Sequence, residues 1–191
     1  MKRALSICAL AVASLGASSA ANAQVTFQGV TFTPSWSGNV LTLEIDAANP
    51  TGDWSTAEAL GALHIKSIGS WDSVVMSGPG SAGSWTIVNN ELNANGCVGG
   101  GGGGNQSACA SGSLIPLTDD MVFQFTFTGG SQDFSMPHIK VQMFEMDGER
   151  KVGSLMSLDI PAIPEPSTYA MLLGGLGLLA VARRNAKKNA A

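Results

Sequence analysis

Hydrophobic and polar side chains alternate, one by one, along several segments of this chain. In Val40–Asp46, leucine and isoleucine alternate with threonine and acidic residues, and in Met121–Thr128 three phenylalanines alternate with glutamine and threonine. Successive side chains of a β-strand point to opposite faces of a sheet, so a period of two indicates a strand with one buried and one exposed face. We therefore predict a strand in each of these two segments.

Other segments have a similar character, and turn-forming residues separate them. They are residues 25–33, 59–68, 73–76, 84–88, 137–146 and 153–159. The turn signals are Asn49-Pro50-Thr51-Gly52, Gly78-Pro79-Gly80, Gly129-Gly130 and Asp147-Gly148, the last being typical of a hairpin tip. About eight short strands predict an all-β fold, an antiparallel β-sandwich of which a jelly roll is one form. A short helix is also expected near Ser55, because Ser55 and Glu58 have capping-box spacing.

The chain begins with a segment of another kind. Lys2 and Arg3 precede an apolar run at residues 4–15, and a small-x-small sequence follows it and ends at Ala23. These are the three parts of a secretory signal peptide. We predict cleavage between Ala23 and Gln24, because the run is too short to anchor the chain across a hydrocarbon core about 30 Å thick.

An uncharged apolar run, residues 168–182, lies near the C-terminus, and Arg183 and Arg184 follow it. As a helix this run spans about 22 Å, and snorkelling arginines with local thinning of the bilayer make up the difference from a core of about 30 Å. It lacks the polar stripe of a helix buried in a soluble domain. We predict one C-terminal transmembrane helix, with the domain outside and the basic tail in the cytoplasm.

Pro164-Glu165-Pro166, then a short helix rich in leucine, glycine and alanine, then an arginine pair at the C-terminus, resembles the PEP-CTERM sorting domain. The resemblance implies that Pro164, Glu165 and Pro166 are the recognition triplet and that Arg183 and Arg184 are the stop-transfer signal. It also implies a partner, the exosortase, a membrane-embedded cysteine-dependent processing enzyme of Gram-negative bacteria that often make exopolysaccharide.

That resemblance implies a route as well: export by the general secretory pathway, transient retention in the membrane, processing near the triplet, and delivery to the outer surface or matrix. The chain then divides into a signal peptide (1–23), an exported β-sandwich domain (24–162) and a sorting signal (163–191).

Two cysteines remain after the signal peptide and Cys8 are removed. Cys97 and Cys109 bracket a run of glycines at residues 99–104. Because an exported chain meets an oxidising compartment, we predict that they form a disulfide. The alternatives are weaker, since a phosphate loop would need a lysine after the glycines, a zinc site further ligands, and a redox pair Cys-x-x-Cys spacing.

Candidate catalytic groups in the exported domain are sparse. His64 and His138 alternate with isoleucines and read as strand residues on a polar face. No serine lies in a G-x-S-x-G elbow, and no EF-hand or tandem Asp-x-Asp loop is present, although a Ca²⁺ site at a loop stays open. We therefore predict no catalytic residue, no cofactor and no metal ligand. The aspartates are scattered along the domain, among them Asp53, Asp72, Asp119, Asp120, Asp133 and Asp147.

The domain has four tryptophans, which have two interpretations. Their rings could form a platform on which sugars stack, or they could pack in the core and at its rim, and the second interpretation is favoured. The four are Trp36, Trp54, Trp71 and Trp85.

Charge changes the picture when it is divided along the chain. The whole chain has a net charge of −4, whereas residues 24–162 contain thirteen acidic and four basic residues, a net charge of −9. An acidic domain without a basic cluster is not a nucleic-acid binder. The function predicted is that of a non-enzymatic surface or matrix protein associated with exopolysaccharide or biofilm. The alternatives are a carbohydrate-binding module on the cell surface and an exported hydrolase with paired carboxylates.

Overall fold

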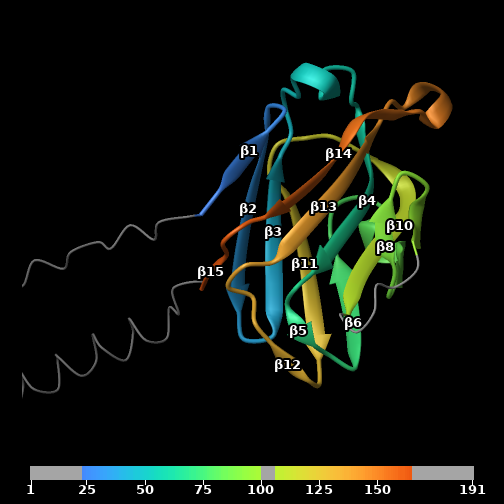
Figure 1. The fold of residues 1–191 in the computed structure, drawn as a ribbon. Coiled ribbons are helices and arrows are strands. Elements are labelled where there is room, and N and C mark those ends of the chain that lie inside the picture. The colour runs from blue at the N-terminus through green and yellow to red at the C-terminus, as the bar shows by residue number, and fades with distance from the viewer. Residues whose placement is uncertain (1–22, 100–105, 165–191) are drawn as a thin grey trace, which may run out of the picture.

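The computed structural model describes residues 23–99 and 106–164, which form strands, turns and three short 3-10 helices (Figure 1). The prediction of an all-β antiparallel fold is therefore confirmed. The elements in chain order are β1 (Val25–Phe27), β2 (Val30–Ser37), β3 (Val40–Asp46), η1 (Gly52–Trp54), β4 (Ala59–Lys66), β5 (Gly69–Ser70), β6 (Ser73–Ser77), η2 (Ala82–Ser84), β7 (Thr86–Val88), β8 (Glu91–Asn93), β9 (Gly96–Gly99), β10 (Ser107–Pro116), β11 (Met121–Thr128), β12 (Ser131–Gln132), β13 (His138–Phe144), η3 (Asp147–Glu149), β14 (Lys151–Asp159) and β15 (Ile163–Pro164).

Two larger sheets face each other and make up most of the described structure (Figure 1). The six-stranded sheet has the order β1-β2-β3-β11-β6, with β15 also beside β2, and the five-stranded sheet has the order β14-β13-β4-β10-β7. Two short pairs, β5 with β12 and β8 with β9, complete the strands of the described residues. Pairing is antiparallel except between β15 and β2, which run parallel.

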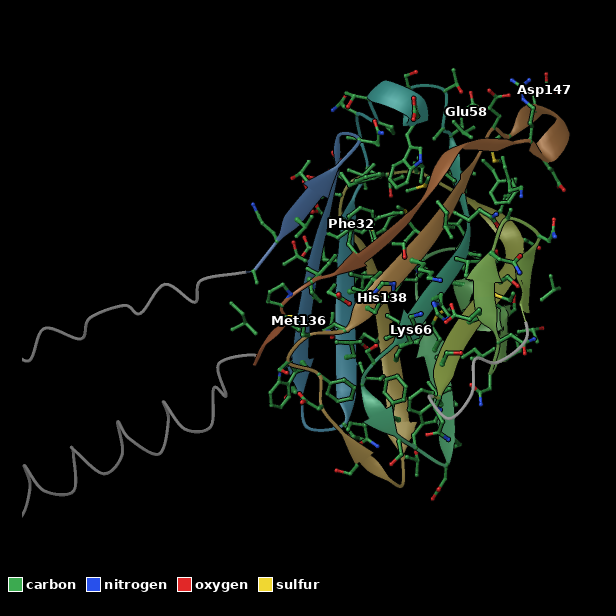
Figure 2. The ribbon with its side chains drawn as sticks, in the orientation of Figure 1. Phe32, Glu58, Lys66, Met136, His138 and Asp147 are labelled. Atoms are coloured by element: carbon green, nitrogen blue, oxygen red, sulfur yellow. A yellow bond between two sulfur atoms is a disulfide. The ribbon has the colours of Figure 1, made fainter. Side chains whose placement is uncertain are left out.

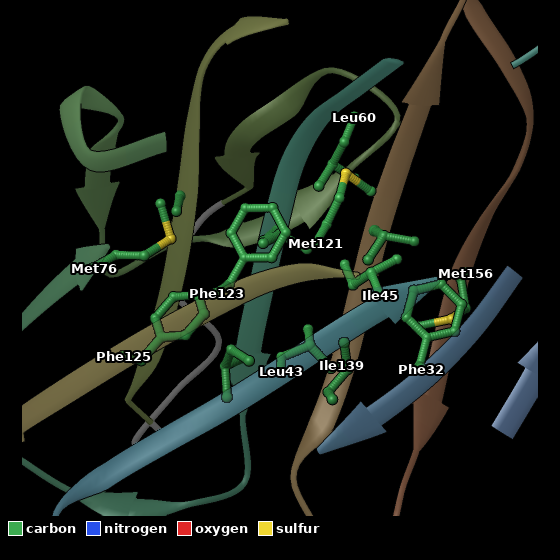
Figure 3. Close-up of a cluster of buried hydrophobic side chains, with 14 of the residues drawn as sticks. Phe32, Leu43, Ile45, Leu60, Met76, Met121, Phe123, Phe125, Ile139 and Met156 are labelled. Carbon is green, nitrogen blue, oxygen red and sulfur yellow. The ribbon is translucent and has the colours of Figure 1, made fainter. Parts of the chain in front are cut away.

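The hydrophobic core fills the space between the two larger sheets (Figure 3). In β3 and β11 the alternation read from the sequence is the alternation of burial, and both strands have the predicted bounds. Phenylalanines from β2 and β11 meet aliphatic and methionine side chains from β4, β13 and β14. The residues labelled in the close-up are Phe32, Leu43, Ile45, Leu60, Met76, Met121, Phe123, Phe125, Ile139 and Met156.

The longest strand of the five-stranded sheet, β10, was not predicted. It lies between β4 and β7, and its first residues are serine, alanine and cysteine, all of them buried. Ala108 and Ala110 face the main core, while Cys109 faces a second small cluster on the opposite side. Small residues on both faces give no contrast in hydropathy, so no period of two is visible.

Two local predictions were wrong. Residues 25–33 form two strands rather than one, because the chain reverses at Gln28 and Gly29, whose φ angles are 51° and 77°. No helix begins at Ser55: η1 ends at Trp54, and the Glu58 carboxylate instead accepts a hydrogen bond from the Met146 backbone N–H at 3.0 Å. The Glu58 side chain thus caps another turn, and β4 begins at the next residue.

The predicted turn at Asp147-Gly148 does connect two antiparallel strands. It forms η3 between β13 and β14, and Glu145 and Arg150 close its base through a bidentate ion pair, with Arg150 Nη2 2.7 Å from Glu145 Oε2. The hairpin prediction is therefore confirmed.

Both ends of the described chain lie at one edge of the six-stranded sheet. β1 pairs with the first half of β2, and β15 pairs with its second half, where Ile163 is opposite Ser35 and Pro164 is opposite Trp36 (Figure 1). Within residues 23–99 and 106–164, no helix is long and apolar enough to cross a membrane. The predicted signal-peptide run and the predicted transmembrane helix at residues 168–182 lie outside the described residues.

Candidate functional site

Most of the basic and histidine side chains of the described structure lie on the outer face of the five-stranded sheet. His138 of β13 is paired in register with Lys66 of β4, and Lys140 is paired with His64. Lys66 and His138 are seen beside each other on neighbouring strands in Figure 2. Since side chains of paired residues share a face, strand pairing alone brings these four groups together.

The hairpin of β8 and β9 lies over this face, which we call the covered face. Leu92 and Cys97 of the hairpin pack against Ala62 and Cys109 of the sheet in a cluster separate from the main core. The Cys97–Cys109 disulfide, with 5.6 Å between the Cα atoms, joins the hairpin to β10. The predicted disulfide is confirmed, and its position shows that it ties a cover to a central strand.

Glu91 of β8 also joins the hairpin to the sheet, through ion pairs with two lysines. Its Oε1 lies 2.7 Å from Lys66 Nζ and its Oε2 lies 2.7 Å from Lys140 Nζ. Partial burial opposes the charged carboxylate, but the hydrogen bonds from Lys140 and Lys66 outweigh it and lower the Glu91 pKa to about 2. One carboxylate therefore pairs with two lysines beneath the hairpin, and the three side chains together keep a net charge of +1.

His64 lies under Glu91 and is fully buried. Neither of its ring nitrogens has a hydrogen-bond partner among the described residues, and Nε2 is 3.9 Å from Glu91 Oε2. Burial lowers the pKa of His64 to about 4, with Glu91 acting in the opposite direction. His64 is thus on the face that the sequence predicted, but the hairpin removes that face from solvent and the ring is neutral at pH 7.

His138 lies at the margin of the covered face and makes two hydrogen bonds. Nδ1 is 2.7 Å from Asp159 Oδ1, and Nε2 is 2.9 Å from Ser157 Oγ. This is the order of contacts in a Ser–His–Asp triad. It differs from such a triad in its surroundings, because the Asp159 side chain is 60% exposed, whereas the orienting carboxylate of a triad is buried.

Two adjoining hollows flank the tip of the β8–β9 hairpin on the covered face. Their volumes are about 340 Å³ and 410 Å³, and Ala94, Gln142 and Lys151 line both. The larger hollow is also lined by Asn95, Ser111 and Phe144, among others. We call the two together the tip groove. Its size lies in the range of ligand-binding pockets, about 300–1,000 Å³.

The floor of the tip groove is a row of paired residues, Ser111 of β10, Ala62 of β4 and Gln142 of β13. Gln142 is largely buried, and its Nε2 donates a long hydrogen bond of 3.4 Å to the Asn93 carbonyl. Lys151, at the start of β14, is exposed. Glu91, Gln142 and Lys151 were not singled out from the sequence, because only strand register shows that they share one face.

The tryptophans do not form a sugar-binding platform. Trp54, Trp71 and Trp85 are buried, and Trp36 is half-buried. Each packs against a phenylalanine at a different place, as Trp71 does with Phe127 at 5.1 Å between ring centroids. The core interpretation of these residues is the correct one.

The acidic residues also take defined positions. The pKa of Asp119 is raised, first by a hydrogen bond with the Asp46 side chain, so these two carboxyl groups interact closely. Glycosidase carboxyl pairs are separated by about 5 Å or more, so this pair does not have their geometry. Among the described residues no group of three or more acidic, histidine or cysteine side chains is placed to hold a metal ion.

Comparison with known families identifies a PEP-CTERM protein-sorting motif at residues 162–188. The chain is therefore a PEP-CTERM protein, an exosortase substrate, and the motif implies export and sorting to the cell surface. No curated protein and no solved structure matches the chain. Of the predicted triplet, Pro164 lies in β15, while Glu165, Pro166, Arg183 and Arg184 lie outside the described residues.

Proposed function

We propose that this chain is a non-enzymatic protein of the cell surface or extracellular matrix that associates with exopolysaccharide after exosortase sorting. The supporting observation is the place where the sorting motif joins the fold. The motif begins at Ala162, whose backbone N–H donates to the Ser135 carbonyl at 3.0 Å, and continues into β15 on the edge of the six-stranded sheet. The sorting motif thus begins within the folded β-sandwich, at one edge of its six-stranded sheet.

The ion pairs and the burial of the ionisable groups support a non-enzymatic function. Glu91 forms ion pairs with both Lys66 and Lys140 under the β8–β9 hairpin, and His64 is buried and neutral. Groups held in mutual ion pairs beneath a disulfide-tied cover stabilise a fold and are not positioned to meet a substrate.

Sorting is tested in a Gram-negative host with and without its exosortase. We expect a shortened protein at the surface or in the matrix of the parent strain, and the unprocessed chain in the membrane fraction of the deletion strain. Replacing Pro164, Glu165 and Pro166 by alanine should reproduce the deletion, whereas replacing Asp133, Gln132 and Ser131 should not. Equal size and location in both strains would refute the proposal.

Association with exopolysaccharide is tested on processed protein collected from the host. We expect it to sediment with purified exopolysaccharide and to stay in solution without it. A protein that stays in solution in both cases would leave only the sorting half of the proposal standing.

The alternative of a carbohydrate-binding module is favoured by one observation, the tip groove with its amide, hydroxyl and aromatic lining. Specific, saturable binding to one glycan on an array would support the module. Weak sedimentation with many polysaccharides would support a matrix protein.

The alternative of an exported hydrolase gains one observation, the hydrogen-bonded series Ser157–His138–Asp159. An activated serine reacts with a fluorophosphonate probe. We expect no labelling of the processed protein. Labelling that disappears in Ser157→Ala but persists in Ser111→Ala would establish an enzyme and overturn the non-enzymatic proposal.

A further inference from the structure

We propose that the tip groove binds an acidic sugar residue of a polysaccharide and that Lys151 pairs with its carboxylate. This inference rests on the proposed association with polysaccharide and names the site and the class of ligand. Positive charge is scarce in this domain, because residues 24–162 contain thirteen acidic residues and only four basic ones, Lys66, Lys140, Arg150 and Lys151.

Three of the four cations already have a carboxylate partner. Lys66 and Lys140 share Glu91, and Arg150 is paired with Glu145. Among the described residues Lys151 forms no ion pair, and it lines both hollows of the tip groove. In a domain with a net charge of −9, a cation left unpaired at the rim of a groove is complementary to an anionic ligand.

The floor of the groove suits a sugar more than a purely apolar ligand. Across β10, β4 and β13 it presents the Ser111 hydroxyl, the small Ala62 side chain and the Gln142 amide. Gln142 forms one long hydrogen bond, so its amide oxygen is left to accept from a ligand hydroxyl. The small side chain of Ala62 makes the depression between the two polar groups.

The walls are an aromatic ring and a hairpin tip. The Phe144 ring lies over Gly61, where a Cβ atom would collide with it, so glycine is required for the ring to take this position. On the other side Asn95 stands at the tip of the hairpin, which the disulfide and Glu91 hold against the sheet. A sugar ring has an apolar face that packs on an aromatic side chain and hydroxyls that bond to amides.

The experiment uses processed protein from the exosortase-positive host and two probes, tetragalacturonic acid and its methyl ester, in which an uncharged methyl ester replaces each carboxylate. We expect the acid to bind and the ester to bind at least about tenfold more weakly, because the charge-assisted hydrogen bond from Lys151 to the carboxylate is lost. Lys151→Ala should weaken binding of the acid to the level of the ester.

Arg150→Ala is the matched control, since it changes the net charge by the same amount at the neighbouring position but leaves the groove untouched. It should bind the acid within about twofold of the unaltered protein, as expected for a screened surface charge. Gln142→Leu should weaken binding of both probes, because it removes the amide from the floor without removing the cation.

Equal binding of acid and ester, or acid binding that survives Lys151→Ala, would overturn this inference. The experiments distinguish a failure of the groove assignment from a failure of the proposed function. A protein that sediments with exopolysaccharide but does not bind the acid keeps the proposed function and loses the groove assignment, whereas a protein that does neither loses both.

Discussion

The two larger sheets of this protein differ in what lies on their outer faces. β3 and β11 of the six-stranded sheet bury one face and expose the other, whereas nearly every residue of β4 in the five-stranded sheet is buried on both faces. The difference comes from the β8–β9 hairpin, which covers β4, β10 and β13. An uncovered sheet face can be left to solvent, but a covered one must satisfy or neutralise every polar group on it.

Three features of the covered face reduce the cost of burying its polar groups. Glu91 forms ion pairs with two lysines, the disulfide ties down the hairpin, and His64 stays uncharged, although its ring nitrogens are not hydrogen-bonded. The six-stranded sheet needs none of them, because water solvates its outer side chains.

Removing a core phenylalanine should have the largest effect. Phe125→Ala on the inner face of β11 should lower the free energy of unfolding by about 3–5 kcal/mol, through lost burial and the cavity it leaves. Gln124→Ala, its neighbour on the outer face, should change it by less than about 0.5 kcal/mol. Urea denaturation of both variants measures the difference, and similar losses would mean that the two faces are not distinct.

Removing the disulfide should have the next largest effect. The double variant Cys97→Ala/Cys109→Ala should lower the free energy of unfolding by about 3 kcal/mol, because the unfolded chain regains the freedom of the short closed loop. Thiol titration of the unaltered protein under denaturing conditions serves as the control and should detect no free thiol. An unchanged urea midpoint in the double variant would show that the hairpin does not need this tie.

Acidification should weaken the covered face through His64. Its pKa is about 4 in the folded protein and about 6.5 in the unfolded chain, so between these values the unfolded state binds more protons. The contribution of neutral His64 to the free energy of unfolding is therefore fully present above pH 6.5 and is lost as the pH falls toward 4. Glu91, with a folded pKa of about 2, adds a further loss below about pH 4.5.

His64→Leu tests this pH dependence. The variant should lose most of the decline in stability between pH 6.5 and 5, and at pH 7 its unfolding free energy should rise by about 1 kcal/mol, since two unpaired nitrogens leave the interior. His138→Asn should keep the decline. A His64→Leu variant with the same pH profile as the parent would contradict the assignment.

The smallest effect is expected at the exposed edge of the six-stranded sheet. Val75 of β6 is 64% exposed, so Val75→Thr should change the unfolding free energy by less than about 0.5 kcal/mol. Met76→Ala, its inward-facing neighbour, should cost about 2 kcal/mol or more. Thermal melts of the two variants measure the difference. An equal loss of melting temperature in Val75→Thr and Met76→Ala would mean that Val75 is not solvent-exposed in the folded protein.

The strands that could be predicted were those with a visible contrast between their faces. Val40–Asp46 and Met121–Thr128 were predicted with their observed bounds, because one face of each is solvated. Ser107–Pro116 was missed because small residues occupy both of its faces, and Glu91–Asn93 with Gly96–Gly99 was missed because these strands are short and rich in glycine and asparagine. The disulfide was predictable from export and spacing, whereas the tip groove was not.

By itself the sequence determined the all-β class, the cysteine pair and the PEP-CTERM motif, since these depend on local alternation, on residue type and on a contiguous signal. Tertiary structure alone decided that Lys66, Lys140 and Glu91 meet, that His64 is buried, and that Lys151 and Gln142 share a groove. The physical reason is that these groups lie on separate strands, and only the register and order of the strands in the sheet bring them within reach of one another.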